Sequence, residues 1–470
     1  MKSTIIRDIL AVCPVSAAST GLTAPTGCAG EHIGGTTIHN LLGMGQVDEE
    51  TTFDEIFGRV LCQPIVVERI KGFIRLIIDE ASMLSRRLLN FVKRILQQVR
   101  KDISSDSYGG VQVILLGDFT QLPPVEKRHA RMSDKEFAEL VGNSWCFSGD
   151  SWQALNLKPF LLTKVERTNE PVLRRLVANA SSNSWTPEDT QEIQRRKFST
   201  ETLRGSDKNN NITFLSAARA NADRINSQIA ADKIKTKKDP STHIYQFSPS
   251  EEFSRKVSDD LKKQLREGCR FPHFVSAFPG CRVMFLAPGK VQAYHPTYKK
   301  VEEVDIVNGT IADVFDYGEK EFFEKQDKLG ILGSFGRDQI RKALKVKLKS
   351  GYTFLVGGME DSVTIGDATL TRFQYPVDLC YAITIHKSQS KSFDRIHIVM
   401  TGSESFTTGL FYVALSRART LTGITIDQAF DMSKVRLGPH DDVKRLYAKL
   451  FPDVAFPWSL GCKRSLTLVE

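Results

Sequence analysis

Two short apolar segments that each end in an acidic residue constrain the fold of this chain more than any other feature. Residues 75–79 and 111–118 are such segments, and each has the length of a strand buried in a parallel sheet. Between them, residues 85–101 carry apolar side chains at helical spacing. Parallel strands need a crossover connection, which is usually a helix. Since similar alternation runs through the first 165 residues or so, the sequence predicts an α/β domain with a parallel sheet flanked by helices.

The pattern changes further along the chain. Residues 166–275 are mostly helical and charged, with a strand end at Phe214 and Leu215 and a polar, lysine-rich stretch over 233–270. From about 280 to 375, short apolar segments alternate with glycine-rich turns, which predicts antiparallel strands. These segments are 283–286, 310–314, 343–349 and 352–354. We therefore expect a small β-barrel inserted in a second α/β domain, whose strand-helix pattern returns over 378–426.

Alternating lysines mark one of these expected strands. Lys345, Lys347 and Lys349 alternate with apolar residues, so the three lysines share one face of the strand. A solvated edge strand explains this stripe better than a DNA contact does.

Bulk properties exclude several classes of protein. A chain of 470 residues is too long for a single core and predicts two to four domains. The net charge of +9 mildly favours a polyanionic partner. The eight cysteines are scattered, with no zinc spacing, and we expect free thiols in a reducing compartment. No apolar run is long enough to span a bilayer, and Arg7 and Asp8 interrupt the apolar start, so we expect a soluble, non-secreted chain.

A carboxylate pair closes the first apolar strand. In nucleotide-hydrolysing folds, the first residue of such a pair holds Mg²⁺, usually through water, and the second activates the attacking water. Asp79 and Glu80 match that pattern. The structural alternative is a helix start, where acidic residues are also favoured.

Further candidate groups for phosphate chemistry follow. Gln121 lies just past the second strand, in the segment 117–124, where a Gln can sense the γ-phosphate or the water, and two prolines stiffen the loop. Arg167 and Arg417 are candidates for the cationic fingers that stabilise charge in phosphoryl transfer. Taken singly, each of these residues is more often an ordinary surface residue.

The ordered set of motifs resembles the petite-integration-frequency family of superfamily-1, 5′-to-3′ DNA helicases, and more distantly the RecD-type helicases. The matching segments span nearly the whole chain in the family's order. They are 22–27, 33–39, 78–84, 109–112, 117–125, 307–310, 383–389 and 412–418. Two departures stand out: Ser390 occupies a position where the family usually has Gly, and Thr168 follows Arg167 where Gln is usual.

The resemblance implies two RecA-like P-loop domains, with an SH3-like β-barrel inserted in the second. The implied boundaries are 1–165 for the first domain, 166–280 and 376–470 for the two parts of the second, and 281–375 for the barrel. ATP and Mg²⁺ are the implied ligands. Asp79 and Glu80 would be the Mg²⁺ and catalytic-base pair, Gln121 the γ-phosphate sensor, and Arg167 and Arg417 the fingers.

The start of the chain resembles the end of a phosphate-binding loop. Lys2 and Ser3 stand where the family has its phosphate-binding Lys and Mg²⁺-binding Ser, and Thr4 joins them as an ATP-binding candidate. The loop's glycines and the strand before them are absent from the sequence, so we expect weak or no ATP turnover from the chain as written. A start codon placed too far downstream explains this better than an ATPase-inactive, single-stranded-DNA-binding paralogue. In-frame upstream genomic sequence would distinguish the two.

Small polar groups predict the DNA track, because a single-strand motor contacts the backbone without regard to sequence. The candidates from the first domain are Pro25, Thr26, Gly27, Thr36, Thr37 and His39, and those from the second are His386 and Lys387. His39 as a buried structural histidine is an equal alternative.

The resulting hypothesis is an ATP-dependent motor on single-stranded DNA and forks, monomeric and without a membrane. Its expected roles are DNA repair, recombination, replication or telomere maintenance. We expect a nuclear location, with the mitochondrion as the alternative. A nucleotide kinase would not need the second-domain motifs 385–389 and 414–417.

Overall fold

The computed structural model describes residues 2–12, 19–45, 47, 51–124, 144–162, 168–206, 211–236, 245–319, 334–335, 342–400 and 405–454. The chain forms two compact units. The first unit joins Met1–Phe198 with Ser388–Glu470, and the second is Ser199–Lys387. The domain boundaries inferred from the sequence stay a prediction.

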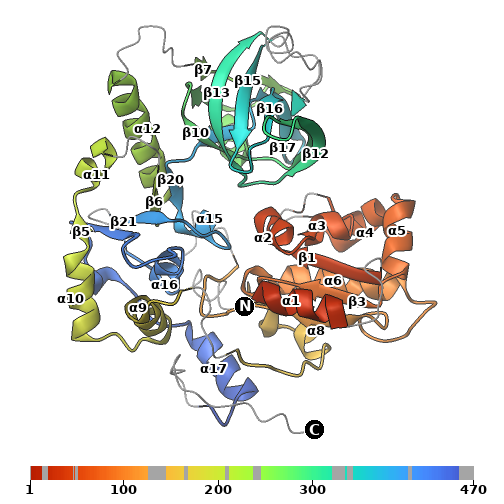
Figure 1. Ribbon diagram of the computed structural model, residues 1–470. Helices are drawn as coiled ribbons and strands as arrows, with labels where there is room; N and C mark the ends of the chain where they lie inside the picture. The colour runs from red at the N-terminus through yellow and green to blue at the C-terminus, as the bar shows by residue number, and fades with distance from the viewer. Residues whose placement is uncertain are drawn as a thin grey trace. The chain divides into compact units, whose positions relative to one another are not determined.

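A four-stranded parallel sheet forms the centre of the N-terminal half of the first unit (Figure 1). Its strand order is β2-β1-β3-β4, and neighbouring strands pair in parallel, with Ile77 of β3 opposite Ile114 of β4. The two predicted apolar strands are therefore confirmed as parallel neighbours. The bounds are β1 (Thr20–Ala24), β2 (Thr36–Thr37), β3 (Arg75–Ile78) and β4 (Gln112–Leu115).

Helices cover both faces of this sheet. On β3, Leu76 and Ile78 pack into the large apolar cluster that includes α6 (Arg86–Val99), whereas Ile77 packs with Ile6 of α1 (Lys2–Val12) on the opposite face. This two-sided burial explains why β3 is apolar at its last three positions, Leu76 to Ile78. Further helices in this half are α2 (Gly27–His32), α3 (Ile38–Leu41), α4 (Phe53–Leu61), α5 (Pro64–Lys71) and α8 (Asp150–Gln153).

The helix predicted over 85–101 is confirmed as α6, and its start has a local cause. The Ser85 hydroxyl accepts a hydrogen bond from the Leu88 backbone N–H at 3.1 Å, which caps the first turn. The apolar positions of α6 then fall on one side of the helix and are buried in the core.

The rest of the first unit contains a second set of parallel strands. β22 pairs with β21 on one side and with β5 on the other. Helix α10 begins with a capping box, in which Thr186 and Asp189 satisfy each other's backbone N–H groups. The bounds are α9 (Pro171–Ser182), α10 (Pro187–Arg195), β5 (Lys197–Phe198), β21 (Arg395–Val399), α16 (Leu410–Leu415), β22 (Ile424–Asp427) and α17 (Asp441–Leu450).

The second unit has a short parallel pair beside a β-rich region. β6 pairs in parallel with β20, and helix α12 packs on both. Buried Asn226 of α12 fixes this packing, because its amide donates to the carbonyls of Leu379 and Ala382 and accepts from the backbone N–H groups of Tyr381 and Ala382. The bounds are α11 (Thr200–Ser206), β6 (Ile212–Ser216), α12 (Arg219–Thr236) and β20 (Ala382–Thr384).

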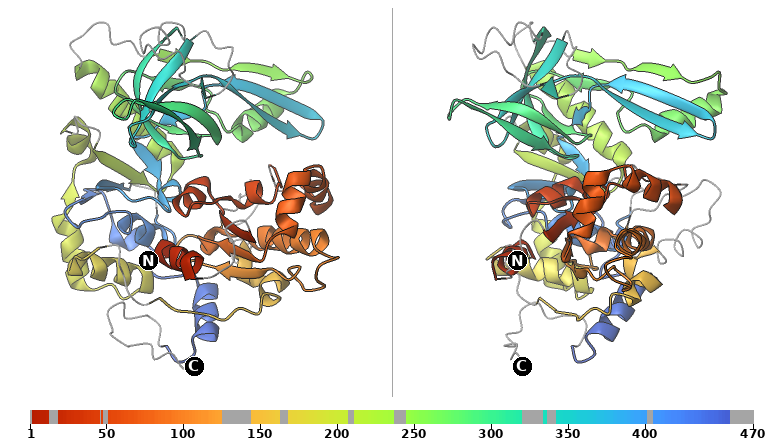
Figure 2. Two further views of the ribbon diagram at one scale, coloured as in Figure 1. Left: turned by 45° about the vertical axis from the view of Figure 1, so that its right-hand side comes forward. Right: turned by 90° about the vertical axis from the view of Figure 1, so that its right-hand side faces the viewer.

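The predicted antiparallel strands are confirmed in the β-rich region. An eight-stranded sheet follows the order β12-β11-β16-β15-β13-β10-β19, with β14 added on β16. The hairpin of β17 and β18, cyan in Figure 2, pairs instead with β8, and β7 pairs with β9. The bounds are β7 (Tyr245–Phe247), β8 (Ser250–Phe253), α13 (Asp259–Gly268), β9 (Val275–Ala277), β10 (Arg282–Phe285), β11 (Gly289–His295), β12 (Lys300–Ile306), β13 (Ile311–Glu319), β14 (Ser334–Phe335), β15 (Lys342–Leu348), β16 (Thr353–Val356), β17 (Met359–Ile365), β18 (Ala368–Gln374) and β19 (Val377–Leu379).

The lysine stripe does not mark an edge strand, so that interpretation was wrong. β15 pairs with β13 on one side and with β16 on the other. Leu344, Val346 and Leu348 are buried, while Lys345 and Lys347 are half-buried on the opposite face. Alternation in the sequence identifies the two faces of a strand, but whether both edges are paired depends on neighbours far along the chain.

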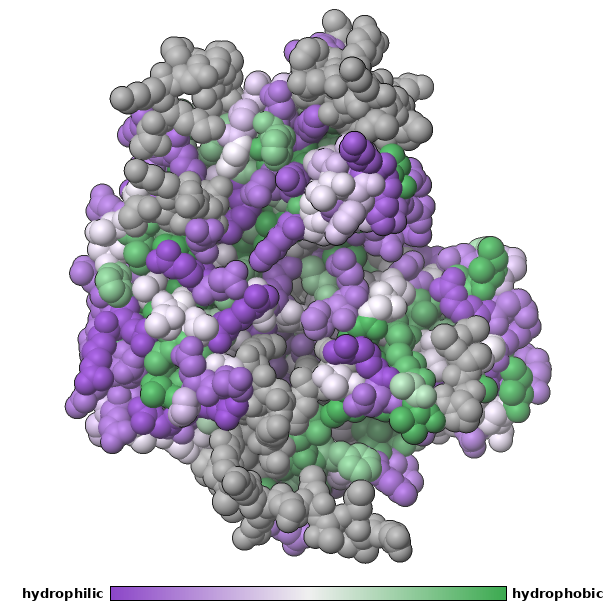
Figure 3. Space-filling model, in the orientation of Figure 1, coloured by the Kyte–Doolittle hydropathy of each residue, from purple (hydrophilic) through white to green (hydrophobic). Residues whose placement is uncertain are grey.

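The face of the molecule drawn in Figure 3 is largely hydrophilic. Hydrophilic side chains cover most of the face drawn in Figure 3, with apolar side chains among them around α1. Six cysteines lie in the described ranges, and none of the six forms a disulfide there. Within those ranges, no helix combines the length and the apolar character that a bilayer crossing requires.

Candidate functional site

The carboxylate pair lies at the carboxyl end of β3, as the sequence predicts. Asp79 and Glu80 are 4% and 7% exposed, and the Glu80 backbone N–H donates to Asp79 Oδ1 at 2.8 Å. Glu80 has a φ of 52°, a left-handed conformation that side chains other than Gly and Asn rarely adopt. Strained backbone of this kind clusters at functional sites, because the surrounding structure must hold it in place.

A second cluster forms just past β4, around Asp118. Its Oδ2 accepts hydrogen bonds from Gln121 Nε2 at 3.2 Å and from the Tyr412 hydroxyl at 2.5 Å. Its Oδ1 accepts from the backbone N–H and hydroxyl of Thr120. Asp118 therefore fixes the side chain of Gln121, the predicted γ-phosphate sensor, and links it to α16.

Three consecutive residues, 389–391, reach these clusters from the C-terminal part of the first unit. Gln389 Nε2 donates to Gln121 Oε1 at 3.3 Å, Ser390 Oγ donates to Glu80 Oε1 at 3.2 Å, and Lys391 Nζ lies 3.0 Å from Cys28 Sγ. The 389–391 segment thus contacts both residues expected to act on the attacking water.

Arg417 is 1% exposed and is held beside the same segment. Its guanidinium donates to the carbonyl of Val413 at 2.9 Å, to the carbonyl of Lys391 at 3.2 Å and to Ser416 Oγ at 2.6 Å. In this structure Arg417 therefore supports the backbone of the 389–391 segment. Its role as a finger on the γ-phosphate stays a prediction, since a finger would have to share or leave these bonds.

The remaining ATP-binding candidates are only partly placed. Lys2 and Ser3 fall in the first turn of α1, but their side chains lie outside the described part of the structure, and Thr4 is exposed. Arg167 also lies outside the described residues. The phosphate-binding roles given to these four residues stay predictions.

The DNA-binding candidates of the first unit gather where β1 and β2 end. Ala24 pairs with Thr37, so the two strands finish side by side and lead into α2 and α3. Thr26 caps α2, and Thr37 caps α3 by accepting from the Asn40 N–H at 3.2 Å. Both hydroxyls thus have a structural use besides any contact with DNA.

The other members of this group are also held by local contacts. Thr36 Oγ1 accepts from Asn40 Nδ2 at 2.8 Å. Pro25 and Gly27 are half-buried where the chain passes from β1 into α2. Burial lowers the pKa of His39 below its usual value, so this half-buried ring is neutral at pH 7. The alternative of a structural histidine therefore stays open.

His386 and Lys387 are exposed at the start of α15 (Ile385–Ser388). The backbone N–H of Lys387 donates to Thr384 Oγ1 at 3.3 Å. Exposed side chains directly after a parallel strand are available to a ligand, as the DNA-binding prediction requires.

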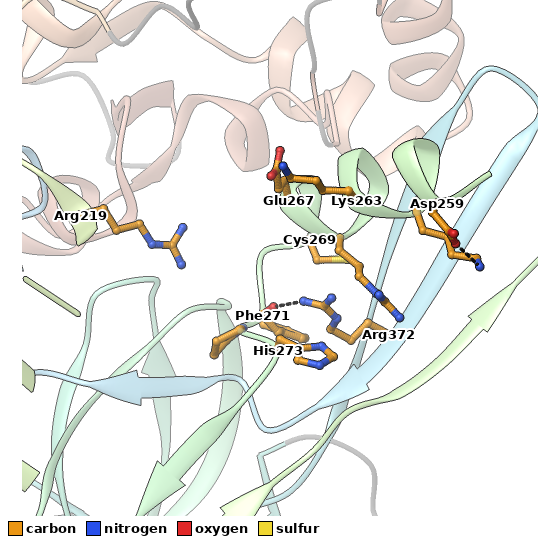
Figure 4. Close-up of a pocket in the computed structure, with 11 residues that line it drawn as sticks. Arg219, Asp259, Lys263, Glu267, Cys269, Phe271, His273 and Arg372 are labelled. Carbon is orange, nitrogen blue, oxygen red and sulfur yellow. Dashed lines mark hydrogen bonds and ion pairs between the residues drawn. The ribbon is translucent and has the colours of Figure 1, made fainter. Parts of the chain in front are cut away.

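A basic cavity of about 580 Å³ lies elsewhere in the second unit (Figure 4). Arg219 points toward it from α12, while Arg372 and His273 lie at its other side, and α13 contributes Lys263. Arg372 is 2% exposed, and its charge is neutralised by Glu251, whose Oε1 accepts a hydrogen bond from the guanidinium at 2.6 Å. The charges exposed toward the cavity are mostly positive, which favours an anionic ligand. The full lining is Arg219, Asp259, Lys262, Lys263, Arg266, Glu267, Cys269, Phe271, Pro272, His273 and Arg372.

The described residues form no group of three or more His, Cys, Asp or Glu that could enclose a metal ion. Mg²⁺ does not need such a group in a nucleotide site, because it binds through one or two carboxylates together with waters and phosphate oxygens. A buried carboxylate such as Asp79 at a strand end fits that requirement.

The structure reveals site residues to which sequence reasoning gave no role. Asp118, Tyr412 and Gln389 lie inside matched motifs, so a role could have been sought for each of them. Lys391 and Cys28 lie outside the matched motifs, and no sequence signal points to their contact. Ser390 was noticed only as a departure from the resembling family.

Comparisons with known proteins agree with the motifs. Residues 1–180 match the family described as PIF1-like helicase. Over 92% of its length, the chain is 27% identical to the ATP-dependent DNA helicase PIF7 of Trypanosoma brucei brucei, and the match spans 44% of that relative. The chain therefore spans about half the length of this curated relative.

Solved structures show the same fold. The Pif1 helicase of Candida albicans superposes with a TM-score of 0.69 at 23% identity, covering 96% of this chain and 92% of that one. Bacteroides Pif1 bound to single-stranded DNA gives a TM-score of 0.66 at 22% identity, covering 95% and 90%. At these identities the likeness establishes the fold.

Proposed function

Because the chain belongs to the PIF1-like helicase family, we propose that it is an ATP-driven motor that moves 5′ to 3′ along single-stranded DNA and unwinds duplexes. One observation carries the proposal furthest. Glu80 and Gln121, at the ends of neighbouring strands, are both hydrogen-bonded by the 389–391 segment, which follows His386 and Lys387 directly. Residues expected to act on ATP are thereby joined to residues expected to touch DNA.

The chemistry follows from the positions of these side chains. In hydrolysis, a water oxygen bonds to the γ-phosphorus, and the bond from that phosphorus to the bridging oxygen breaks as ADP leaves. Glu80 would accept the proton that the water loses, and Gln121 would orient the water. Asp79 is the residue that would hold Mg²⁺, which neutralises phosphate charge when bound.

The proposed DNA contacts are of two sets, the ends of β1 and β2 in the first unit and His386 and Lys387 in the second. Single-strand motors contact phosphates and sugars through hydroxyls, backbone N–H groups and cations. Among similar structures, Bacteroides Pif1 has been solved bound to single-stranded DNA, and another concerns unwinding at forked double-stranded DNA by two coordinating Pif1 helicases. This likeness and the positive net charge support the same partners for this chain.

The decisive experiment measures ATP hydrolysis with and without single-stranded DNA. The assay compares the chain as written, for which we expect weak or no turnover, with a version extended upstream through the phosphate-binding loop. In the extended version we expect DNA to stimulate hydrolysis, and Glu80→Gln to abolish it while leaving DNA binding intact. Unwinding is then measured on duplexes with a 5′ or a 3′ single-stranded tail, and only the 5′ tail should support it. DNA binding without ATP hydrolysis, by the chain as written and by the extended version alike, would instead indicate a binding paralogue.

We further propose a monomeric motor that serves DNA repair, recombination, replication or telomere maintenance. The nucleus is the proposed location, with the mitochondrion as the alternative. The motif resemblance supports these assignments. Sedimentation with and without single-stranded DNA tests the monomer, and fluorescence microscopy of the tagged chain tests the location.

A further inference from the structure

Two residues with left-handed backbone are hydrogen-bonded to each other in the first unit. Glu80 has φ 52° and Ser390 has φ 66°, and the Ser390 hydroxyl donates to Glu80 Oε1 at 3.2 Å. The other non-glycine residues with positive φ in the described ranges are Asn156, Asn183 and Lys299. Ser390 is thus placed unfavourably for a serine, directly against the expected catalytic base.

The backbone of Ser390 calls for glycine, which adopts positive φ without steric cost. Glycine is also what the motif resemblance predicts at this position. A serine here differs from glycine by one hydroxymethyl group, whose oxygen reaches the Glu80 carboxylate. The strain is therefore accompanied by one identifiable gain, a hydrogen bond to Glu80.

The neighbours of Ser390 fix its position from both sides. Gln389 donates a hydrogen bond to the side chain of Gln121, and the carbonyl of Lys391 accepts one from buried Arg417. Lys391 also reaches Cys28 through its side chain. Because its neighbours are fixed on both sides, the backbone of Ser390 cannot shift when the Glu80 carboxylate rotates. A rotation of that carboxylate would therefore break the hydrogen bond from the Ser390 hydroxyl, and the bond restricts the rotation.

We propose that Ser390 is a positioning residue for Glu80. Its hydroxyl holds Oε1 and so orients the carboxylate toward the place of the attacking water. The hydroxyl does not itself take part in proton transfer, which passes from the water to Glu80. This inference rests on the proposed function, since it assigns Ser390 a part in the same hydrolysis.

Two substitutions separate positioning from a structural effect. Ser390→Ala removes the hydroxyl and keeps the backbone strain, whereas Ser390→Gly removes both. We expect kcat for DNA-stimulated ATP hydrolysis to fall about 3- to 10-fold in both variants, with an unchanged KM for ATP. Ser390→Gly should at the same time have a higher Tm than Ser390→Ala. If Ser390 were merely structural, activity would follow Tm and the glycine variant would be at least as active as the parent.

The outcomes distinguish this inference from the proposed function. An active parent chain with unchanged or raised kcat in both variants overturns the role of Ser390 alone. A parent chain that hydrolyses no ATP, also when it is extended upstream through the phosphate-binding loop, overturns the proposed function, and the role of Ser390 with it. A double-mutant cycle of Ser390→Ala and Glu80→Ala on denaturant unfolding tests the contact without any activity. Coupled effects on the unfolding midpoint support it, and additive effects overturn it.

Discussion

Tyr412 of α16 donates its hydroxyl hydrogen to Asp118 Oδ2 across 2.5 Å, at the end of the strand that leads to Gln121. The same carboxylate oxygen accepts from Gln121, so one group holds both the predicted γ-phosphate sensor and a residue 294 positions further along the chain. A carboxylate that accepts several donors is rigidly oriented. Gln121 is therefore positioned by tertiary contacts rather than by its loop alone.

Replacing Tyr412 by Phe should weaken this link without removing the ring. We expect a loss of about 1–3 kcal/mol in the free energy of unfolding, because the bond is made to a charged acceptor. ATP hydrolysis should also slow, since Asp118 loses one of the contacts that fix it. The measurements are denaturant unfolding and DNA-stimulated hydrolysis.

Tyr108→Phe is the matched control for this variant. The Tyr108 hydroxyl donates a hydrogen bond to the carbonyl of Ser151 at 2.7 Å in the same unit. Tyr108→Phe should lower the free energy of unfolding but leave the rate of ATP hydrolysis unchanged. Equal loss of activity in the two variants would contradict a specific role for Tyr412.

Gly409 should not tolerate a side chain. Its φ is 84°, and a Cβ added there would lie 2.7 Å from the carbonyl oxygen of Gln121. Gly409→Ala should therefore destabilise the chain by about 1–3 kcal/mol and displace Gln121. Gly205→Ala is the control, because Gly205 has open space around it in α11 and alanine favours a helix. A Gly409→Ala variant as stable and active as the parent would show that the close approach is absent.

The sequence predicts those parts of the site that depend on short-range patterns. Helix α6 follows from its Ser85 cap and apolar spacing, and Asp79 follows from the end of an apolar strand. Ser390 and Glu80 are different, because they are 310 positions apart and their contact depends on how the chain closes. The prediction of an edge strand from the lysine stripe of β15 was wrong for the same reason, since periodicity identifies the faces of a strand but not its neighbours.

The stability of the second unit should depend on pH through Asp378 of β19. Burial, and then the carboxylate of Asp223, raise the pKa of Asp378 to about 6, against opposing effects of Lys387, the Leu379 N–H and Arg219. The folded state then holds this proton more tightly than the unfolded chain does. Ionising Asp378 in the folded state therefore lowers the free energy of unfolding. This loss of stability is absent below the ordinary pKa near 4, grows as the pH rises from 4 to 6, and is constant above pH 6.

Asp378→Asn should remove that penalty, because asparagine stays neutral and can still accept the Leu379 N–H that Asp378 accepts at 2.9 Å. Near pH 7.5 the variant should be more stable than the parent by roughly 3 kcal/mol or less, and near pH 4 the difference should vanish. Urea unfolding across this range measures the difference. Asp260→Asn, at an exposed position on α13, is the control. A stability difference that does not change with pH would contradict the assignment.

The basic cavity of the second unit predicts a contact with DNA phosphates. Lys263 is exposed on α13 and lines this cavity together with Arg219 and His273. A lysine that neutralises a phosphate releases counterions from the DNA, so its loss weakens binding similarly for all sequences. Lys263→Ala should therefore raise the Kd for single-stranded oligonucleotides of different composition by a similar factor.

The dependence on salt separates this effect from misfolding. Loss of one phosphate contact should reduce the slope of log Kd against log salt concentration by about 0.7. Lys71→Ala is the control, because Lys71 pairs with Glu68 at 3.0 Å on the surface of the first unit and should leave the slope unchanged. Fluorescence anisotropy at several salt concentrations gives both quantities. An unchanged slope with a weaker Kd for Lys263→Ala would mean that the residue supports the fold of α13 and that the cavity does not take part in DNA binding.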